Sequence, residues 1–501
     1  MTQRNYMDDQ FCEVKWFKDA QFRMPFSTTL AAGAIFCAGM DAAMAEDNTA
    51  PAATPPAYTV LRYDEDYSYL KDPAARTNTF DAVKYIPLDG WTNSYVTLGG
   101  QVRDRYEYFE NFQFGSAAQN GNGYNLLRVM GNADFHFGPN FRVFIQGISA
   151  TEQGRIGGPR ASDEDEFDLH QGFAELDLPL AKDVSLGVRA GRQIIIFGAQ
   201  RLIGVSDFTN VRRTYDGVRG TLTTPGNTLD GFYARPVAIL PYEFDNDVHN
   251  TYITGVYDTW SIPGALAKAK TKLDMYLFYV NRNAITYNQT TSGENRYTFG
   301  TRLYATPKPF DYDLEMDYQV GRFHEQATHS FSVAAIGGYT LESALFKPRV
   351  FLGSDIASGG RTNHIGDTFD QLFPSGHDQF GIIDALGRQN IIDIHPGVTL
   401  TLLENRPGVQ QLTMLTQYRQ FWRESNEDAS YTSSATILRP SSARSTSSSI
   451  GGEVDVQLNW QINRNFSAYM GYCHFFHGSF IAETGPNPDI DFAYSALTFT
   501  F

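Results

Sequence analysis

Arginines at alternate positions of extended segments are the residues of this sequence best suited to chemistry. Arg103 and Arg105 are two residues apart, and Glu107 follows at the same spacing. Arg419 and Arg423 lie in a later segment of the same kind. A guanidinium group binds carboxylates through paired hydrogen bonds and keeps its charge at neutral pH. The chemistry that these residues offer is therefore the reversible binding of anions.

The segments that carry these arginines have one apolar face and one charged face. In residues 102–108, Val102 and Tyr106 alternate with Arg103 and Arg105. In residues 312–320, Tyr312, Leu314, Met316, Tyr318 and Val320 alternate with Asp313, Glu315, Asp317 and Gln319. Alternation with a period of two indicates a β-strand with two different environments. An arginine facing lipid at mid-bilayer costs about 2–4 kcal/mol, so we expect the charged faces to line a wet lumen.

Such segments recur from Tyr95 to the end of the chain, and the connections between them alternate between short and long. We expect strands at 95–109, 125–137, 141–150, 166–178, 184–195, 214–223, 229–236, 250–260, 271–282, 296–305, 312–322, 331–340, 348–356, 395–403, 411–422, 450–461, 466–477 and 491–501. The long connections are expected at 110–124, 151–165, 197–213, 282–295, 357–394 and 423–449. The pattern predicts an all-β fold, a transmembrane antiparallel up-and-down β-barrel of about 18 strands, with short periplasmic turns and long extracellular loops.

The chain ends on a strand, Phe492–Phe501, with the sequence FAYSALTFTF. A barrel needs a closing strand that pairs with the first one and leaves no edge in lipid. We expect this strand to lie beside the first, to end in the periplasm and to be the contact for the barrel-assembly machinery. The other expected partners are outer-membrane lipid and lipopolysaccharide.

The composition and the front of the chain fit export to the outer membrane. Mean hydropathy is −0.33, and no apolar run of about 20 residues is present. Residues 1–45 are predicted to be a signal peptide cut after Ala45, with Met24 as an alternative start, and residues 46–94 to be a Pro/Ala-rich linker and periplasmic lead-in. Beyond residue 45 the one cysteine is Cys473, which predicts a packing residue and excludes a disulfide framework. The net charge of −16 argues against nucleic acid as a partner.

The sequence resembles the alginate export family of outer-membrane β-barrels from about Tyr63 to Phe501. The resemblance rests on the order and spacing of several short stretches. They are Arg62–Asp66, Tyr69–Pro73, Lys84–Leu88, Leu98–Gly100, Arg103–Glu107, Gly191–Gln193, Arg201–Gly204, Asn210–Arg213, Tyr215–Arg219, Phe373–His377, Phe421–Arg423, Gly471–Tyr472 and Gly478–Phe480. The resemblance implies an 18-stranded barrel whose arginine-rich pore passes an anionic uronate polymer.

The candidate pore-lining and anion-binding residues are Arg103, Arg105, Arg189, Arg201, Arg212, Arg213, Arg219, Arg302, Arg419 and Arg423. The candidate counter-charges in the lumen are Glu107, Asp313, Glu315 and Asp317. Two interpretations of the arginines stay open: a ladder of ion pairs that stiffens the wall, or a positive lining that selects anions. The leading hypothesis is a porin for anionic polysaccharide such as alginate or for other organic anions. The alternatives are an outer-membrane enzyme, for which no Ser/His/Asp cluster can be assembled, and a general or uptake porin for small solutes.

No cofactor or metal is predicted. His364, His377 and His395 lie within and just after the longest expected loop, together with Asp367, Asp370, Asp378 and Asp384. Their spacing matches no compact pattern of metal ligands. Glycine pairs follow no βαβ pattern, so nothing indicates nucleotide binding.

Overall fold

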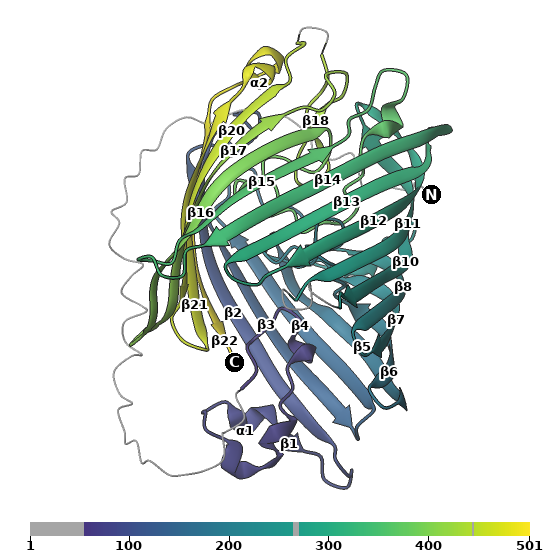
Figure 1. Cartoon of the computed structure of the whole chain (residues 1–501), viewed down its shortest axis with the longest axis vertical. Coiled ribbons are helices and arrows are strands. Elements are labelled where there is room, and N and C mark those ends of the chain that lie inside the picture. Colours follow the sequence, from purple (N-terminus) through teal and green to yellow (C-terminus); the bar gives the residue numbers. More distant parts are fainter. Residues whose placement is uncertain (1–54, 264–269, 443–444) are drawn as a thin grey trace. The chain divides into compact units, whose positions relative to one another are not determined.

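The computed structural model describes residues 55–263, 270–442 and 445–501 and is an antiparallel β-barrel (Figure 1). The barrel strands are β2 (Tyr95–Glu110), β3 (Asn122–Phe137), β4 (Phe141–Gln153), β5 (Asp165–Ala181), β6 (Val184–Gln193), β7 (Tyr215–Thr224), β8 (Asn227–Ala238), β10 (Thr251–Ser261), β11 (Lys272–Tyr287), β12 (Thr290–Ala305), β13 (Phe310–Phe323), β14 (Gln326–Thr340), β15 (Arg349–Ala357), β16 (Ile391–Arg406), β17 (Val409–Trp422), β20 (Ser449–Gln461), β21 (Phe466–His477) and β22 (Ile490–Thr500). Each pairs with the next, and β22 pairs with β2, which closes 18 strands as predicted. The predicted signal peptide lies outside the described residues.

The seam between β22 and β2 joins the two ends of the barrel sequence. Arg103 lies opposite Thr498 and Gln101 lies opposite Thr500 in the register of the two strands. The backbone of Phe501 exchanges hydrogen bonds of 3.0 and 3.1 Å with Gly100. A side chain on Gly100 would collide with the ring of Phe501, so glycine is required for the end of the chain to lie there. The Arg62 Nη2 atom, in the lead-in before β2, donates to the Phe501 carbonyl at 2.8 Å and so stabilises the seam.

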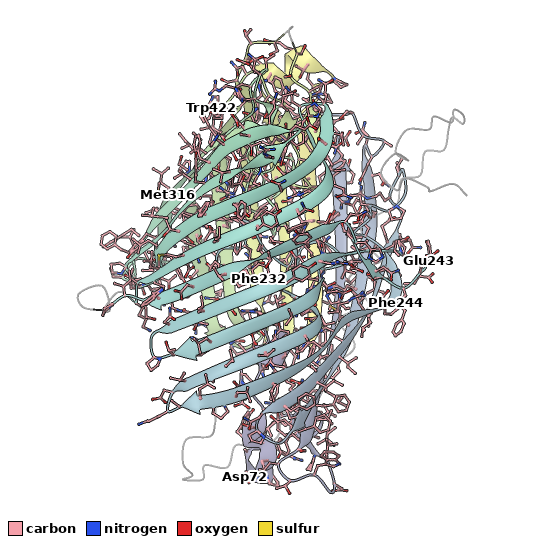
Figure 2. All side chains as sticks on the ribbon, turned by 90° about the vertical axis from the view of Figure 1, so that its right-hand side faces the viewer. Asp72, Phe232, Glu243, Phe244, Met316 and Trp422 are labelled. Carbon is pink, nitrogen blue, oxygen red and sulfur yellow. The ribbon has the colours of Figure 1, made fainter. Side chains whose placement is uncertain are left out.

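The two faces of the wall are divided as the alternation predicts. Met316 is 58 % exposed and lies on the outer surface (Figure 2), while its neighbours Glu315 and Asp317 are buried on the inner side. Arg103 and Arg105 are buried in the same way, whereas Val102 lies outside. The exposed outer side chains are largely aliphatic and aromatic, which suits contact with lipid hydrocarbon. Within the described residues no helix is long and apolar enough to cross a membrane.

The connections have different lengths at the two ends of the barrel. One end has two-residue turns at 182–183, 225–226 and 407–408, and the other has loops at 154–164, 194–214, 358–390 and 423–448. The long loop predicted at 282–295 is wrong. There β11 and β12 continue past the expected strand ends and meet in a two-residue turn, Asn288-Gln289. We assign the end with long loops to the cell exterior.

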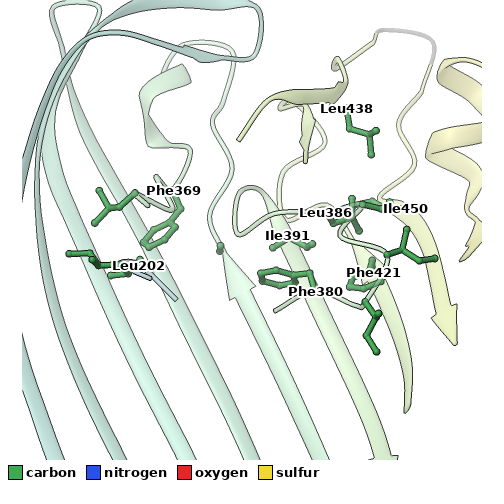
Figure 3. Packing of buried hydrophobic residues seen from close by; sticks show 14 of the residues in the cluster. Leu202, Phe369, Phe380, Leu386, Ile391, Phe421, Leu438 and Ile450 are labelled. Atoms are coloured by element: carbon green, nitrogen blue, oxygen red, sulfur yellow. The ribbon is translucent and has the colours of Figure 1, made fainter. Parts of the chain in front are cut away.

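Two long loops fold into the barrel and pack against each other. Residues 194–214 connect β6 to β7, yet Arg103 on β2 binds carbonyl oxygens of this loop, so the loop crosses the lumen. Residues 358–390 connect β15 to β16 and meet the first loop in a parallel bridge between Ile203 and Phe373. Leu202, Phe369, Phe380 and Leu386 from these loops join one apolar cluster with wall residues such as Phe421 (Figure 3). Cys473 is buried in the same cluster, as expected of a packing residue.

The lead-in before β2 is compact and closes onto the end with short turns. It contains three 3-10 turns (Arg62–Asp64, Ser68–Lys71 and Pro73–Ala75), α1 (Asp81–Lys84) and β1 (Ile86–Pro87), which pairs with β2. The ring of Tyr63 packs edge-on against Phe144 and Phe173, with centroids 5.4 and 5.1 Å away. Both phenylalanines are buried on the inner face of the wall, so Tyr63 enters the lumen.

We expect the docking of this lead-in to strengthen as the pH rises from about 7 towards 10.5. Lys84 is 1 % exposed and donates to the Leu98 carbonyl at 2.8 Å. Burial, helped by the charge of Arg62, lowers the pKa of Lys84 from 10.5 to about 7. An undocked Lys84 therefore binds more protons than a docked one between these two values, and docking becomes more favourable as they are released. Thermolysin cleavage of residues 55–94, normalised to cleavage of heat-denatured protein, should be slower at about pH 9 than at about pH 6.

The variant Lys84→Met is the control for this pH dependence. It keeps the apolar stem of the side chain and cannot bind the proton, so its normalised cleavage rate should be the same at both pH values. An equal pH dependence in the variant and the wild type would contradict the assignment to Lys84.

Candidate functional site

A cavity of about 960 Å³ lies inside the barrel between the lead-in and the loop 194–214. Its wall is formed by β2, β3, β17, β20, β21 and β22, and residues 55–60 contribute to its periplasmic side. Its uncharged polar wall residues are Gln101, Gln410, Gln457, Asn459, Gln461, Ser467, Tyr469, Thr498 and Thr500. Thr498 and Thr500 share this lumen with Arg103, because the seam register places them beside β2. The cavity is thus a polar chamber lined by uncharged hydrogen-bonding groups and arginines.

Three arginines converge at the loop side of this chamber. Arg103 and Arg128 lie directly opposite each other on β2 and β3, and Arg212 reaches them from the loop 194–214. The carboxylate of Asp207 accepts from Arg128 Nη2 at 2.9 Å and from Arg212 Nε at 2.6 Å. Arg103 Nη1 donates to the Asp207 carbonyl at 2.7 Å. Like charges opposite each other on paired strands repel, and the negative charge of Asp207 offsets the repulsion between Arg103 and Arg128.

The charge of the cluster stays positive at all physiological pH values. Burial opposes the ionisation of Asp207, but Arg212, Arg128 and Arg103 outweigh it and hold the pKa of this carboxyl well below its usual range. Three guanidinium groups and one carboxylate leave two positive charges. Arg464 adds another at the periplasmic side, and Asp207 is the one carboxylate among the described residues of the lining. The chamber is therefore positive within a chain whose total charge is −16.

Phe208 lines the large cavity beside the arginine cluster. Its ring stacks on His377 of the second loop, with centroids 3.5 Å apart, and lies edge-on to Tyr494 of β22. Arg105 lies over the same ring at 4.0 Å and pairs with Glu107 at 2.8 Å. Burial disfavours the charged form of His377, but the Asp384 carboxylate 2.8 Å from Nδ1 outweighs it and raises the pKa of this histidine. Residues of the wall and of both loops thus hold aromatic and cationic side chains together at this point of the lumen.

A second cavity, of about 250 Å³, lies on the other side of the inward loops. Arg201, Arg349 and Arg419 line it together with Asp355, Asp378 and His395. Here the charges are balanced: Arg419 Nη1 is 2.7 Å from Asp393, and Arg201 pairs with Asp313 at 3.0 Å and with Glu315. This region is an ion-pair network more than a positive surface.

The ten predicted arginines divide into three groups in the structure. Arg103 and Arg212 line the large cavity, and Arg201 and Arg419 line the small one. The second group pairs with acids along the wall: Arg105 with Glu107, Arg189 with Glu175, Arg219 with Asp230, and Arg302 with Asp274 and Asp313. The third group holds loops: Arg213 donates to the carbonyls of Phe373 and Pro374, and Arg423 to those of Asn426, Asp428 and Ser447. The ladder of ion pairs describes the second group, and the arginines of the first group are the ones that line cavities.

Of the predicted counter-charges, Glu107, Asp313 and Glu315 meet arginines, while Asp317 accepts a hydrogen bond from Tyr276 at 2.7 Å. His364, His377 and His395 do not form one ligand group in the part of the chain described. His395 instead lies 2.7 Å from Asp393, a carboxylate that Arg419 already neutralises.

Arg128, Arg464 and Asp207 are site residues that the sequence did not identify. Arg128 alternates with Leu127 and Val129, both exposed on the outer face, so its inward direction was readable from the sequence. Its position opposite Arg103 follows from the strand register, which the sequence alone does not fix. Asp207 has no such signal, because it lies on a loop whose path depends on distant contacts.

A closed 18-stranded antiparallel barrel with an apolar exterior and a charged, hollow interior defines an outer-membrane porin. The sequence model of one family, described as alginate export, matches residues 94–490. The chain belongs to the alginate export family, as the resemblance of its motifs predicted. A comparison with curated proteins finds no match.

Solved structures of Pseudomonas aeruginosa proteins share the fold at low sequence identity. OccK8 (OprE) matches with a TM-score of 0.53 at 12 % identity, over 81 % of this chain and 98 % of the other. OccK2 (OpdF), solved in complex with glucuronate, matches with a TM-score of 0.53 at 11 % identity over the same shares. OpdK, solved with vanillate, matches with a TM-score of 0.52 at 11 % identity, again over 81 % and 98 %. The protein is thus an outer-membrane porin channel by family and by fold.

Proposed function

We propose that this channel conducts anionic solutes, and that carboxylate-bearing sugars of the alginate type are their leading class. The observation that carries the proposal is the lining of the large cavity, in which four arginines face one carboxylate. Arg103, Arg128 and Arg212 are the groups proposed to meet the solute, with Arg464 at the periplasmic mouth. Their planar guanidinium groups form paired hydrogen bonds with carboxylates, and the surrounding amides and hydroxyls can form hydrogen bonds with sugar hydroxyls.

Family membership supports a polymer as the solute, since the matching family is described as alginate export. The small solutes named in the two complexes with neighbours, glucuronate and vanillate, both bear a carboxylate and support the same charge preference. They also favour a second candidate function, uptake of small organic anions. Passage in either case needs sites that attract the solute and release it, and guanidinium groups that already donate to Asp207 would bind a passing carboxylate weakly.

Recordings from purified protein in planar bilayers test the proposal. In a KCl gradient, the zero-current potential should show that chloride permeates more readily than potassium. Cation preference, or the absence of channels, would overturn it. Oligouronates of increasing length then separate the two candidates. Interruption of the current that strengthens with chain length supports the polymer, whereas equal interruption by monomer and oligomer supports small anions.

Assembly and export complete the proposal. We infer that the C-terminal strand Phe492–Phe501 is the segment that the barrel-assembly machinery engages, since it forms one side of the seam and ends in an aromatic residue. The outer face contacts lipid, and lipopolysaccharide is the proposed neighbour of the loops. Cleavage of a signal peptide at residue 45 stays a prediction from the sequence.

A further inference from the structure

Three buried aspartates gather at the end of the barrel that carries the long loops. Asp165 and Asp168 lie at the start of β5, and Asp245 lies in the segment 239–250 between β8 and β10. One carboxylate oxygen of each lies within 4.8 Å of one from each of the others. Their exposed fractions are 1, 2 and 6 %. Figure 2 shows Glu243 and Phe244 of the same segment at the edge of the barrel.

The negative charge of this group is not balanced by its surroundings. Arg192 is the neighbouring cation, and its Nη1 atom is 3.8 Å from Asp168. Its other two nitrogens bind Asp216, at 2.9 and 3.0 Å, so one arginine serves four carboxylates. Buried carboxylates without a compensating charge are costly, so the arrangement calls for another cation.

Two of the carboxylates also carry oxygens without a hydrogen bond. Among the described residues, nothing donates to Oδ2 of Asp165 or to Oδ1 of Asp168, although both atoms are buried. The remaining contacts hold the group in place: Asp168 Oδ2 accepts from the Asp245 backbone at 2.6 Å, and Asp245 Oδ1 accepts from the Leu240 backbone at 2.6 Å. Backbone contacts therefore hold the Asp168 and Asp245 carboxylates, and the buried Asp165 Oδ2 atom beside them has no hydrogen-bond donor among the described residues.

We propose that Asp165, Asp168 and Asp245 bind a hard divalent cation, with Ca²⁺ the best fit. The cluster offers oxygen ligands only, which suits Ca²⁺ better than Zn²⁺, whose structural sites are built from Cys and His. Calcium tolerates irregular geometry and six to eight ligands, so water and carbonyl oxygens complete the shell. The cation would join the segment 239–250 to β5.

The proposed site also stabilises the loop 194–214, which carries Arg212. The segment leading to Asp165 also holds the loop 194–214: the Val211 amide donates to the Ser162 carbonyl at 2.9 Å, and Asn210 Nδ2 donates to the Asp163 carbonyl at 2.9 Å. A cation bound to Asp165 therefore also stabilises the start of β5, where the preceding residues are hydrogen-bonded to the loop 194–214. The inference does not depend on which solute the channel carries.

Thermal unfolding of the full protein in detergent, treated with EDTA and then titrated with CaCl₂, tests the site. The wild type should unfold at a higher temperature with Ca²⁺, because the cation binds the folded state. Asp165→Asn should abolish this shift, and in EDTA it should unfold no earlier than the wild type because it relieves repulsion between carboxylates. Glu166→Gln is the matched control, since Glu166 is exposed, adjacent and outside the cluster, and its Ca²⁺ shift should equal that of the wild type.

The proposal would be overturned by the absence of a Ca²⁺ shift in the wild type, or by a full shift in Asp165→Asn. An equal loss in Glu166→Gln would also overturn it, because the response would then be general to surface charge. Tb³⁺ luminescence of the wild type, competed with Ca²⁺, measures binding directly. Asp245→Asn, on the loop, replaces the strand variant if that one fails to fold.

Discussion

Neutralising Arg128 and Arg212 together should abolish most of the anion preference of the channel. The cluster of Arg103, Arg128, Arg212 and Asp207 carries two net positive charges, and Arg128→Gln/Arg212→Gln leaves it near zero. Charges at a constriction act within the Debye length of about 8 Å at physiological salt, so they govern selectivity where the passage is narrow. The zero-current potential in a KCl gradient should therefore move towards that of an unselective pore.

Arg219→Gln is the matched control for this experiment. It also removes an inward-facing arginine of the wall, but that arginine pairs with Asp230 at 2.8 Å and lines neither cavity. Its effect on the zero-current potential should be small, and both proteins should show the same heat-modifiable migration as the wild type. A double variant that keeps the wild-type selectivity would show that the filter lies elsewhere.

Removal of the inward loop should raise the single-channel conductance several-fold. β6 and β7 are paired neighbours, so residues 194–214 can be replaced by a two-residue Asn-Gly turn without separating the strands. The replacement removes Asp207, Phe208 and Arg212 from the lumen, and we expect these side chains to form the constriction of the passage. Conductance follows the narrowest section, so it should increase while selectivity falls. Recordings in symmetrical KCl measure both.

A finer variant tests the aromatic part of the same constriction. Phe208→Ala removes the ring that stacks on His377 and should raise the conductance by less than the loop replacement does. Phe310→Ala is its control, because Phe310 is 65 % exposed at the start of β13 and should leave the current unchanged. A wild-type conductance after loop replacement would contradict the view that this loop narrows the channel.

The wall of the barrel was predictable because lipid imposes a simple rule on each strand. Leu314 and Met316 had to face hydrocarbon, so Glu315 and Asp317 had to face inward. The rule fails where the strands leave the lipid. Beyond residue 282 the hairpin contains exposed polar residues such as Thr291 and no clear apolar face, so the alternation gave no signal for the two-residue turn that follows.

The site was only half predictable, because it depends on loops. The inward direction of Arg103 and Arg419 follows from alternation, but whether an arginine meets solute or an acid depends on what packs above it. Arg212 lines the large cavity because Ile203 and Phe373, which are 170 residues apart in sequence, join two loops inside the lumen. Contacts of that range have no counterpart in local sequence pattern, and they decide which arginines stay accessible.

The seam between β22 and β2 also affects how the barrel folds. Arg62 and Phe501 touch across 439 positions of sequence, so the contact that completes the barrel is among the most distant in the chain. Contacts at such separation are entropically expensive to form and come late in folding. Until β22 pairs with β2, the sheet has two unpaired edges, and both are open to aggregation. Closure of the seam is therefore the step that removes the last free edge, and a protein in which β22 cannot pair with β2 would remain an unclosed sheet.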